Sequence, residues 1–312
     1  MNNLNSNPAQ EQPDSKIWAS LELMRPANIV TAFSDILAGF AAAGSLFILL
    51  GDELSVQYSG LGWLLLSTFG LYGGGVVMND VFDAELDADE RPERPIPSGR
   101  ISKTGGAFLG VSLLILGVIS AALVNLTAAF LALIIAVCAL FYDYKAKHSV
   151  ILGPLFMGLC RAGNLLLGMS IVPLVILDLW PLLFIPLFYI GSITLISQGE
   201  VKGGNSTPGF LALMIIFVIV CVLLFLSLLP DYQFFPVLPF VILFTAMVLP
   251  PFWKAAVNPV AIHNKKAVKR GVVSLIILNS SIAAGFGGLA MGMIVILLLP
   301  VSFLLSKIFE VT

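Results

Sequence analysis

Long apolar runs recur along nearly the whole chain, and they limit what it can fold into. Hydrophobic residues make up 58% of the 312 residues, charged residues make up 11%, and the mean hydropathy is +1.00. An apolar run of about 18 or more residues can cross the hydrocarbon core of a bilayer as an α-helix. The repeated runs therefore predict an all-α, polytopic transmembrane helical bundle and exclude an ordinary water-soluble globule.

The apolar runs give nine or ten spans. They lie at 28–50, 60–79, 104–124, 126–142, 149–172, 180–197, 208–229, 234–253, 271–287 and 288–306. The count depends on the glycine-rich "AAGFGG" at 283–288, which fits either a tight turn between two short spans or a flexible point in one long segment. Residues 1–15 are polar and have no apolar core, so we expect a disordered tail before a single transmembrane domain at 16–312.

The lysines and arginines indicate how the bundle is oriented. Nearly all of those outside the spans fall in alternate loops, which lie on one side of the predicted bundle. The intervening loops, such as "GDELSVQYSG" and "LPDYQF", contain neither residue. Because cytoplasmic loops are enriched in these cations, the N-terminus is expected in the cytoplasm. No transit segment is visible, so a bacterial-type inner membrane is the expected location.

A dense charged segment follows the second span. Seven acids and three arginines occupy the twenty-one positions 80–100. On a helix that continued past Asn79, the side chains of Asp80, Asp83 and Asp87 would share about 60° of arc and converge. Neighbouring carboxylates repel each other unless a cation neutralises them, so a hard divalent ion such as Mg²⁺ is the expected partner.

The rest of this segment supports a role beyond that of a spacer. Glu85 and Asp89 would point away from the carboxylate face by the same helical geometry. The following "RPERPIPSGR" places Arg91, Arg94 and Arg100 beside prolines and a glycine, as would suit a lid that holds an anionic phosphate next to the metal. The alternative is a solvated charged loop, which is the usual identity of a charge run.

The stretch "NDVFDAELDADERPERPIPSGRIS" resembles the NDxxDxxxD and RPxRPIPSG motifs of the UbiA superfamily of intramembrane prenyltransferases. "LMRPANI" at 23–29 and "FYDYKAKHSVILGPLFMG" also look like segments of that family. The resemblance implies a helical bundle, typically of nine spans, and a transferase that moves a prenyl group from a polyprenyl diphosphate to an acceptor, often aromatic. It implies Mg²⁺ as cofactor and membrane lipid as surroundings, and no nucleic-acid partner.

The chemistry of an allylic diphosphate explains the residue types. Pyrophosphate leaves when its charge is neutralised, and the resulting carbocation must be shielded from water. The predicted metal ligands are Asp80, Asp83 and Asp87, and the predicted catalytic residues are Asp80, Asp83 and Glu200. The predicted substrate-binding residues are Asn79, Arg25, Arg94, Lys145, Lys147, Arg161 and Asn164. Arg161 lies inside the fifth span, where a charge is costly unless it faces a cavity or a partner, and Asp35 is a candidate partner.

The second half of the chain departs from the family pattern. The family normally carries a second acidic cluster at the end of the sixth helix, where this chain has "LISQGEVKGGNSTPG" with Glu200 as its single carboxylate and Lys202 nearby. A catalytically weak, prenyl-diphosphate-binding accessory protein is therefore an alternative. A transporter is less favoured because its polar residues should lie near the midplane. The CDP-alcohol phosphotransferase motif is absent from the sequence.

Overall fold

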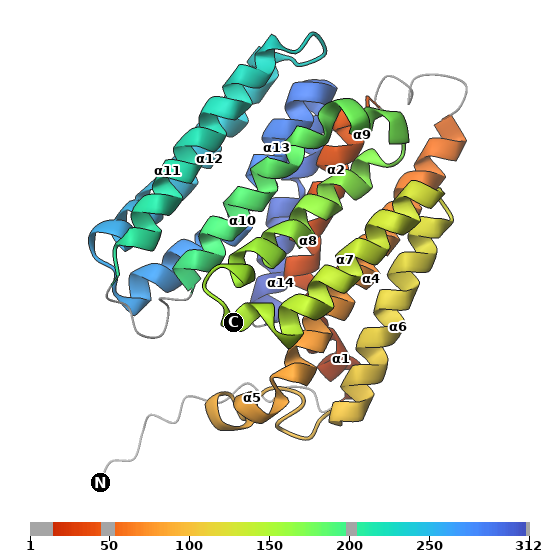
Figure 1. Ribbon diagram of the computed structural model, residues 1–312, viewed down its shortest axis with the longest axis vertical. Helices are drawn as coiled ribbons and strands as arrows, with labels where there is room; N and C mark the ends of the chain where they lie inside the picture. The colour runs from red at the N-terminus through yellow and green to blue at the C-terminus, as the bar shows by residue number, and fades with distance from the viewer. Residues whose placement is uncertain (1–14, 45–53, 198–204, 310–312) are drawn as a thin grey trace.

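The computed structural model describes residues 15–44, 54–197 and 205–309, and all regular structure within these ranges is helical (Figure 1). The α-helices are α1 (Lys16–Met24), α2 (Pro26–Ala42), α4 (Leu54–Phe82), α5 (Ala84–Glu90), α6 (Lys103–Ala122), α7 (Leu126–Tyr144), α8 (Leu152–Met169), α9 (Pro173–Leu179), α10 (Phe184–Ser197), α11 (Thr207–Phe225), α12 (Phe234–Val257), α13 (Ala261–Ile296) and α14 (Leu298–Ile308). Short 3₁₀ turns lie at Ala146–His148, Trp180–Leu183 and Leu226–Leu228. The all-helical prediction is confirmed.

Several helices begin where the sequence provides a cap. The side chains of Ser102 and Asn125 accept hydrogen bonds from the backbone amides of Gly105 and Ala128, in the first turns of α6 and α7. Such caps satisfy amides that have no partner inside the helix. Pro26 opens α2, at a position where its missing amide hydrogen costs nothing. The apolar runs between these signals therefore form helices with defined ends.

Among the described residues, eight helical stretches are long and apolar enough to cross a membrane, and the apolar α2 is shorter. The last of these stretches, Ala261–Ile308, has 48 residues and contains Gly288, whose φ of 74° is readily adopted only by glycine. The chain reverses there, since Asn279 before this glycine bonds Ser34 whereas Ser302 after it bonds Ala27, nearer the start of α2. The structure therefore favours the tight turn over one long segment.

The reversal at Gly288 also places the end of the described chain. The rings of Trp18 and Phe309 stack with centroids 4.8 Å apart, so α1 and the end of α14 lie at the same end of the bundle. Counting α2, and splitting the last stretch at Gly288, the described helices favour ten crossings and not the nine typical of the resembled family.

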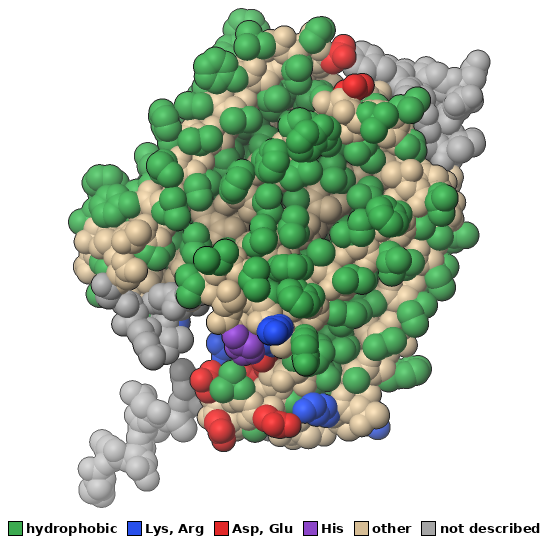
Figure 2. Space-filling view, in the orientation of Figure 1, with side chains coloured by type: hydrophobic (Ala, Val, Ile, Leu, Met, Phe, Trp, Pro, Cys, Tyr) green, Lys and Arg blue, Asp and Glu red, His purple; other side chains and the backbone are tan. Residues whose placement is uncertain are grey.

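The charged loops lie at one end of the bundle, as predicted. Figure 1 shows α1, α5 and the beginning of α13 at its lower end. In Figure 2 the Lys and Arg side chains on the visible face gather at that end, while the rest of this face is mostly hydrophobic. We call this end the charged end.

Helix α2 lies at the centre of the bundle and packs against α4, α8, α13 and α14. It approaches α8 closely at Gly39 and Gly168, where an added Cβ on either glycine would collide with the backbone of the other helix. Small residues at such points let membrane helices approach each other. This approach brings polar side chains of α2 and α8 into contact inside the membrane-spanning region.

Candidate functional site

The predicted metal carboxylates lie where α4 passes into α5. Regular helix ends at Phe82 and resumes at Ala84, and Asp83 between them has φ −89° and ψ 4°. The helical hydrogen bonds nevertheless continue, from the amide of Asp83 to Asn79 and from that of Asp87 to Asp83. The helix therefore continues past Asn79 with a local distortion, much as the prediction required.

Asp80 and Asp87 lie close together, and both are buried. Nη1 of Arg94 is 2.7 Å from Oδ2 of Asp87 and 3.3 Å from Oδ1 of Asp80, so one guanidinium bridges the two carboxylates. Nη2 of Arg25 lies 2.7 Å from the same oxygen of Asp80. Two predicted phosphate-binding arginines thus contact two of the predicted metal carboxylates.

Asp83 has a separate partner. Nζ of Lys147 lies 2.5 Å from Oδ1 of Asp83, and both side chains are mostly buried. Lys145, predicted alongside Lys147, is exposed and is not brought into the cluster. Lys145 directly precedes the 3₁₀ turn Ala146–His148, whereas Lys147 lies within it, so the two side chains have different surroundings.

Other acids of this segment point away, as expected. Glu85 is exposed and pairs with Lys103 on the surface, and Asp89 is also exposed. Arg100 makes two hydrogen bonds with Glu22 of α1, at 2.6 and 3.0 Å. Arg100 therefore fastens the proline-rich segment to α1, while Arg94 is the arginine that reaches the carboxylates.

Asp143 was missed by the sequence analysis. It is buried at the end of α7, and its Oδ1 accepts a hydrogen bond of 2.9 Å from Nδ2 of Asn79. Its Oδ2 is also buried and has no hydrogen-bond partner among the described residues. The signal was a carboxylate at the end of an apolar run, inside the "FYDYKAK" already quoted for its family resemblance.

The donor set fits Mg²⁺ by its chemistry, because carboxylate and amide oxygens are the ligands that this ion prefers. The unpartnered Oδ2 of Asp143 adds one buried oxygen next to Asn79. Within the described ranges, no three His, Cys, Asp or Glu side chains are already arranged to hold a metal ion. Arg25, Arg94 and Lys147 instead neutralise the carboxylates of Asp80, Asp83 and Asp87.

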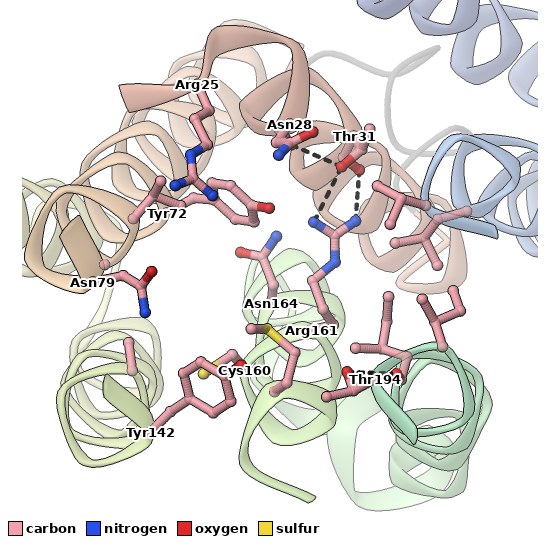
Figure 3. A pocket seen from close by; sticks show the side chains of 18 of the residues that line it. Arg25, Asn28, Thr31, Tyr72, Asn79, Tyr142, Cys160, Arg161, Asn164 and Thr194 are labelled. Atoms are coloured by element: carbon pink, nitrogen blue, oxygen red, sulfur yellow. Dashed lines mark hydrogen bonds between the residues drawn. The ribbon is translucent and has the colours of Figure 1, made fainter. Parts of the chain in front are cut away.

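A cavity of about 320 Å³ adjoins this charged cluster and extends into the bundle (Figure 3). Its outer end, toward the charged end of the molecule, includes Arg25, Asn79 and Asp143. Much of the wall is apolar, with Leu71, Val76, Ile135, Ala139, Met157, Ile190, Ile193, Val268, Val272 and Leu275. The walls come from α2, α4, α7, α8, α10 and α13.

The cavity also has a polar inner end, which contains the predicted pocket residues Arg161 and Asn164. Nε of Arg161 lies 2.9 Å from Oδ2 of Asp35, which confirms the pairing suggested from charge alone. Its Nη2 donates to the backbone oxygen of Thr31 at 2.9 Å, and its guanidinium lies over the ring of Tyr72. Neither Thr31 nor Tyr72 belongs to a motif or charge pattern that stands out in the sequence.

Glu200 and its neighbours lie outside the described residues. Ser197, the last described residue before them, lines the cavity. The chain therefore leaves α10 beside the cavity, and the predicted catalytic role of Glu200 stays a prediction.

Known proteins share both the sequence pattern and the architecture. The chain is 36% identical over 148 residues to digeranylgeranylglyceryl phosphate synthase of Methanothrix thermoacetophila, covering 47% of this chain and 52% of the relative. It is 31% identical over 149 residues to the synthase of Saccharolobus solfataricus, covering 47% and 50%. The matched part is thus about half the length of these curated relatives.

Solved structures match over more of the chain. One, from a study of digeranylgeranylglyceryl phosphate synthase in membranes, has a TM-score of 0.65 at 21% identity and covers 88% of this chain and 99% of its own. A UbiA homolog from Archaeoglobus fulgidus bound to GPP and Mg²⁺ has a TM-score of 0.58 at 16% identity, covering 82% of this chain and 99% of its own. These likenesses show the fold of a membrane-embedded helical bundle.

The sequence model of the UbiA prenyltransferase family matches residues 36–261, which include the carboxylate cluster and most of the cavity wall. This integral membrane protein therefore belongs to the UbiA prenyltransferase family.

Proposed function

We propose that this protein transfers a prenyl group from a polyprenyl diphosphate to an acceptor inside the membrane, with Mg²⁺ as cofactor. The observation that carries the proposal is one cavity whose outer end, at Arg25, Asn79 and Asp143, adjoins the cluster of carboxylates and cations, and whose walls are largely apolar. A diphosphate needs the first environment and a prenyl chain needs the second. The Archaeoglobus fulgidus homolog, which was solved with GPP and Mg²⁺, supports the same division.

At the outer end, Asp80, Asp83 and Asp87 would hold Mg²⁺, with Asn79 as a further oxygen donor or an orienting group. The ion supplies positive charge that neutralises the leaving pyrophosphate. Arg25, Arg94 and Lys147 now face these carboxylates and would bind the diphosphate oxygens once a cation takes their place.

Further inside, the apolar wall performs the protective part of the reaction. Residues such as Leu71, Ile135 and Val272 exclude water from the carbon that becomes electron-poor when the diphosphate leaves. The cations bind the departing charge at the outer end, so the reactive carbon would lie deeper, beside the polar inner end. An acceptor held there would be placed for attack on the prenyl carbon.

Donor binding provides the direct test. Purified protein in lipid nanodiscs would be titrated with geranylgeranyl diphosphate in the presence and absence of Mg²⁺. We expect Asp80→Asn to remove the Mg²⁺-dependent part of the affinity and to abolish pyrophosphate release, since it deletes a charge that contacts both arginines. Asp89→Asn is the matched control, because this exposed acid lies nine residues away in sequence and outside the cluster.

The outcome also separates the proposed enzyme from the alternatives. Mg²⁺-dependent donor binding without pyrophosphate release, in the presence of a membrane lipid extract as the source of acceptors, would identify an accessory binder. Equal donor affinity in Asp80→Asn and native protein would contradict the site assignment itself.

A further inference from the structure

Arg161 at the inner end of the cavity already has a counter-ion. Asp35 is fully buried, and its Oδ1 and Oδ2 lie 3.3 Å from Nη2 and 2.9 Å from Nε of Arg161. The same oxygens accept hydrogen bonds from Asn279 at 2.6 Å and Asn164 at 3.2 Å. Both oxygens face nitrogen donors of Arg161, Asn164 and Asn279, so the carboxyl group is placed as the counter-ion of the guanidinium.

Asp35 does not line the cavity, whereas Arg161 does. The carboxylate lies behind the arginine and is held by side chains of α8 and α13. The cavity therefore faces the N–H donors of Arg161, in an ion pair whose net charge is zero. Arg161 is only 5% exposed at its side chain, so solvent contributes little to screening this pair. Removing either charged partner alone would leave the other one buried and unpaired, which is costly.

The inner end of the cavity retains unused hydrogen-bonding groups. Nη1 of Arg161 has only a long contact of 3.4 Å to Oγ1 of Thr31. Among the described residues, the hydroxyl of Tyr72 and the side-chain amide of Asn28 form no hydrogen bond, and both side chains line the cavity. Figure 3 shows Asn28, Thr31 and Arg161 together on one side of the cavity and Tyr72 near them.

The charge balance of this inner end selects the kind of ligand. A bound anion would add a net negative charge to a neutral, buried pair, in surroundings where unpaired charge is strongly disfavoured. An uncharged oxygen could accept hydrogen bonds from Arg161, Asn28 and Tyr72 without any such cost. The outer end differs, because Mg²⁺ on the carboxylates would free Arg25, Arg94 and Lys147 for the charge of a diphosphate.

We infer that the inner end of the cavity binds the acceptor, and that this acceptor presents an uncharged hydroxyl or carbonyl group, not a carboxylate or phosphate, to Arg161, Asn28 and Tyr72. That this ligand is the acceptor rests on the proposed function. The new points are that the bound group is uncharged and that these three residues select it.

The experiment uses two probes of the same shape, 4-hydroxybenzamide and 4-hydroxybenzoate, which differ in charge at neutral pH. Their equilibrium affinities for the full chain in nanodiscs would be measured with Mg²⁺ and a non-hydrolysable thiodiphosphate analogue of the donor, so that no turnover is needed. We expect the amide to bind at least tenfold more tightly than the benzoate. Tyr72→Phe should weaken amide binding severalfold and leave the affinity for the donor analogue unchanged.

Removing the counter-ion of Arg161 should reverse the preference between the two probes, which is a sharper test. Asp35→Asn leaves Arg161 without its counter-ion, so this variant should prefer the benzoate. The double variant Asp35→Asn with Arg161→Gln is neutral again and should return to the amide. If Asp35→Asn does not fold, the native protein and Tyr72→Phe still decide the question.

Equal or tighter binding of the benzoate by native protein, binding of neither probe, or an unchanged amide affinity in Tyr72→Phe would overturn the inference. Failure of the proposed function would look different. The donor analogue would then not bind, while the amide would still bind native protein more tightly than the benzoate does.

Discussion

Lys145 and Lys147 are two residues apart and have different surroundings. Lys147 is mostly buried and its ammonium contacts the carboxylate of Asp83, whereas Lys145 is exposed to the surface. The two lysines differ because Lys145 lies between α7 and the 3₁₀ turn Ala146–His148, whereas Lys147 lies within that turn. The surroundings of each side chain therefore depend on its place relative to a turn of three residues.

This contrast predicts unequal effects of the same substitution. Lys147→Met should lower the affinity for a prenyl diphosphate by roughly tenfold, since a charged hydrogen bond in a mostly buried site is removed. Lys145→Met, the matched control, should change the affinity less than twofold. Donor titration of both variants measures this, and equal losses would show that the two lysines act on the diphosphate together.

Residue types and spacing were enough to predict part of the charged cluster beside the cavity. The motif after the second span identified Asp80, Asp83, Asp87 and Arg94, because its residues are near one another in the chain. Asp143 was not predicted, because its contact with Asn79 joins α7 to α4 across 64 positions. Such a contact depends on how the helices pack, which a single sequence does not specify.

At the scale of helices, the approach of α2 to α8 holds the inner end of the cavity together. Gly39 and Gly168 lie where the two backbones meet, within one turn of Ile36 and Leu165. Asp35 and Arg161 belong to the same interface. The apolar runs predicted both helices well, but they gave no information about which helices would be neighbours.

Adding one methyl group at this crossing tests how closely α2 and α8 must pack. Gly168→Ala would place a Cβ against the backbone of Ile36, where no flexible side chain can move aside. Overpacking of this kind typically costs about 1–3 kcal/mol. We expect a lower thermal unfolding midpoint in detergent, together with weaker binding at the inner end of the cavity.

Gly62→Ala is the matched control for that change, since it lies in α4 with open space around the added methyl group. Its unfolding midpoint should stay the same or rise slightly, because alanine is the better helix former. If the two substitutions had equal effects, close packing of α2 on α8 would not be what Gly168 provides.

Across the whole molecule, the reversal at Gly288 decides where the chain ends. With ten crossings, α1 and the end of α14 share one side, as the stacking of Trp18 on Phe309 requires. With nine, they would lie on opposite sides of the membrane. The composition of the chain could not distinguish these cases, because residues 271–306 are apolar on both sides of the glycines.

Labelling of single cysteines from either side of the membrane tests this topology. The native cysteines Cys138, Cys160 and Cys221 would first be replaced by alanine, and a cysteine would then be introduced at Ser98, Asp231 or Ser306 in separate variants. Ser98 follows α5 at the charged end, whereas Asp231 lies in the turn beside Gly285, close to the reversal.

We expect the Ser98 and Ser306 variants to react with an impermeant maleimide from the same side, and the Asp231 variant from the opposite side. Because lysines and arginines gather at the charged end, the side shared by Ser98 and Ser306 should be the cytoplasm. Labelling of Ser306 together with Asp231 would contradict the reversal at Gly288 and leave a chain of nine crossings, with its C-terminal helix unable to contact α1.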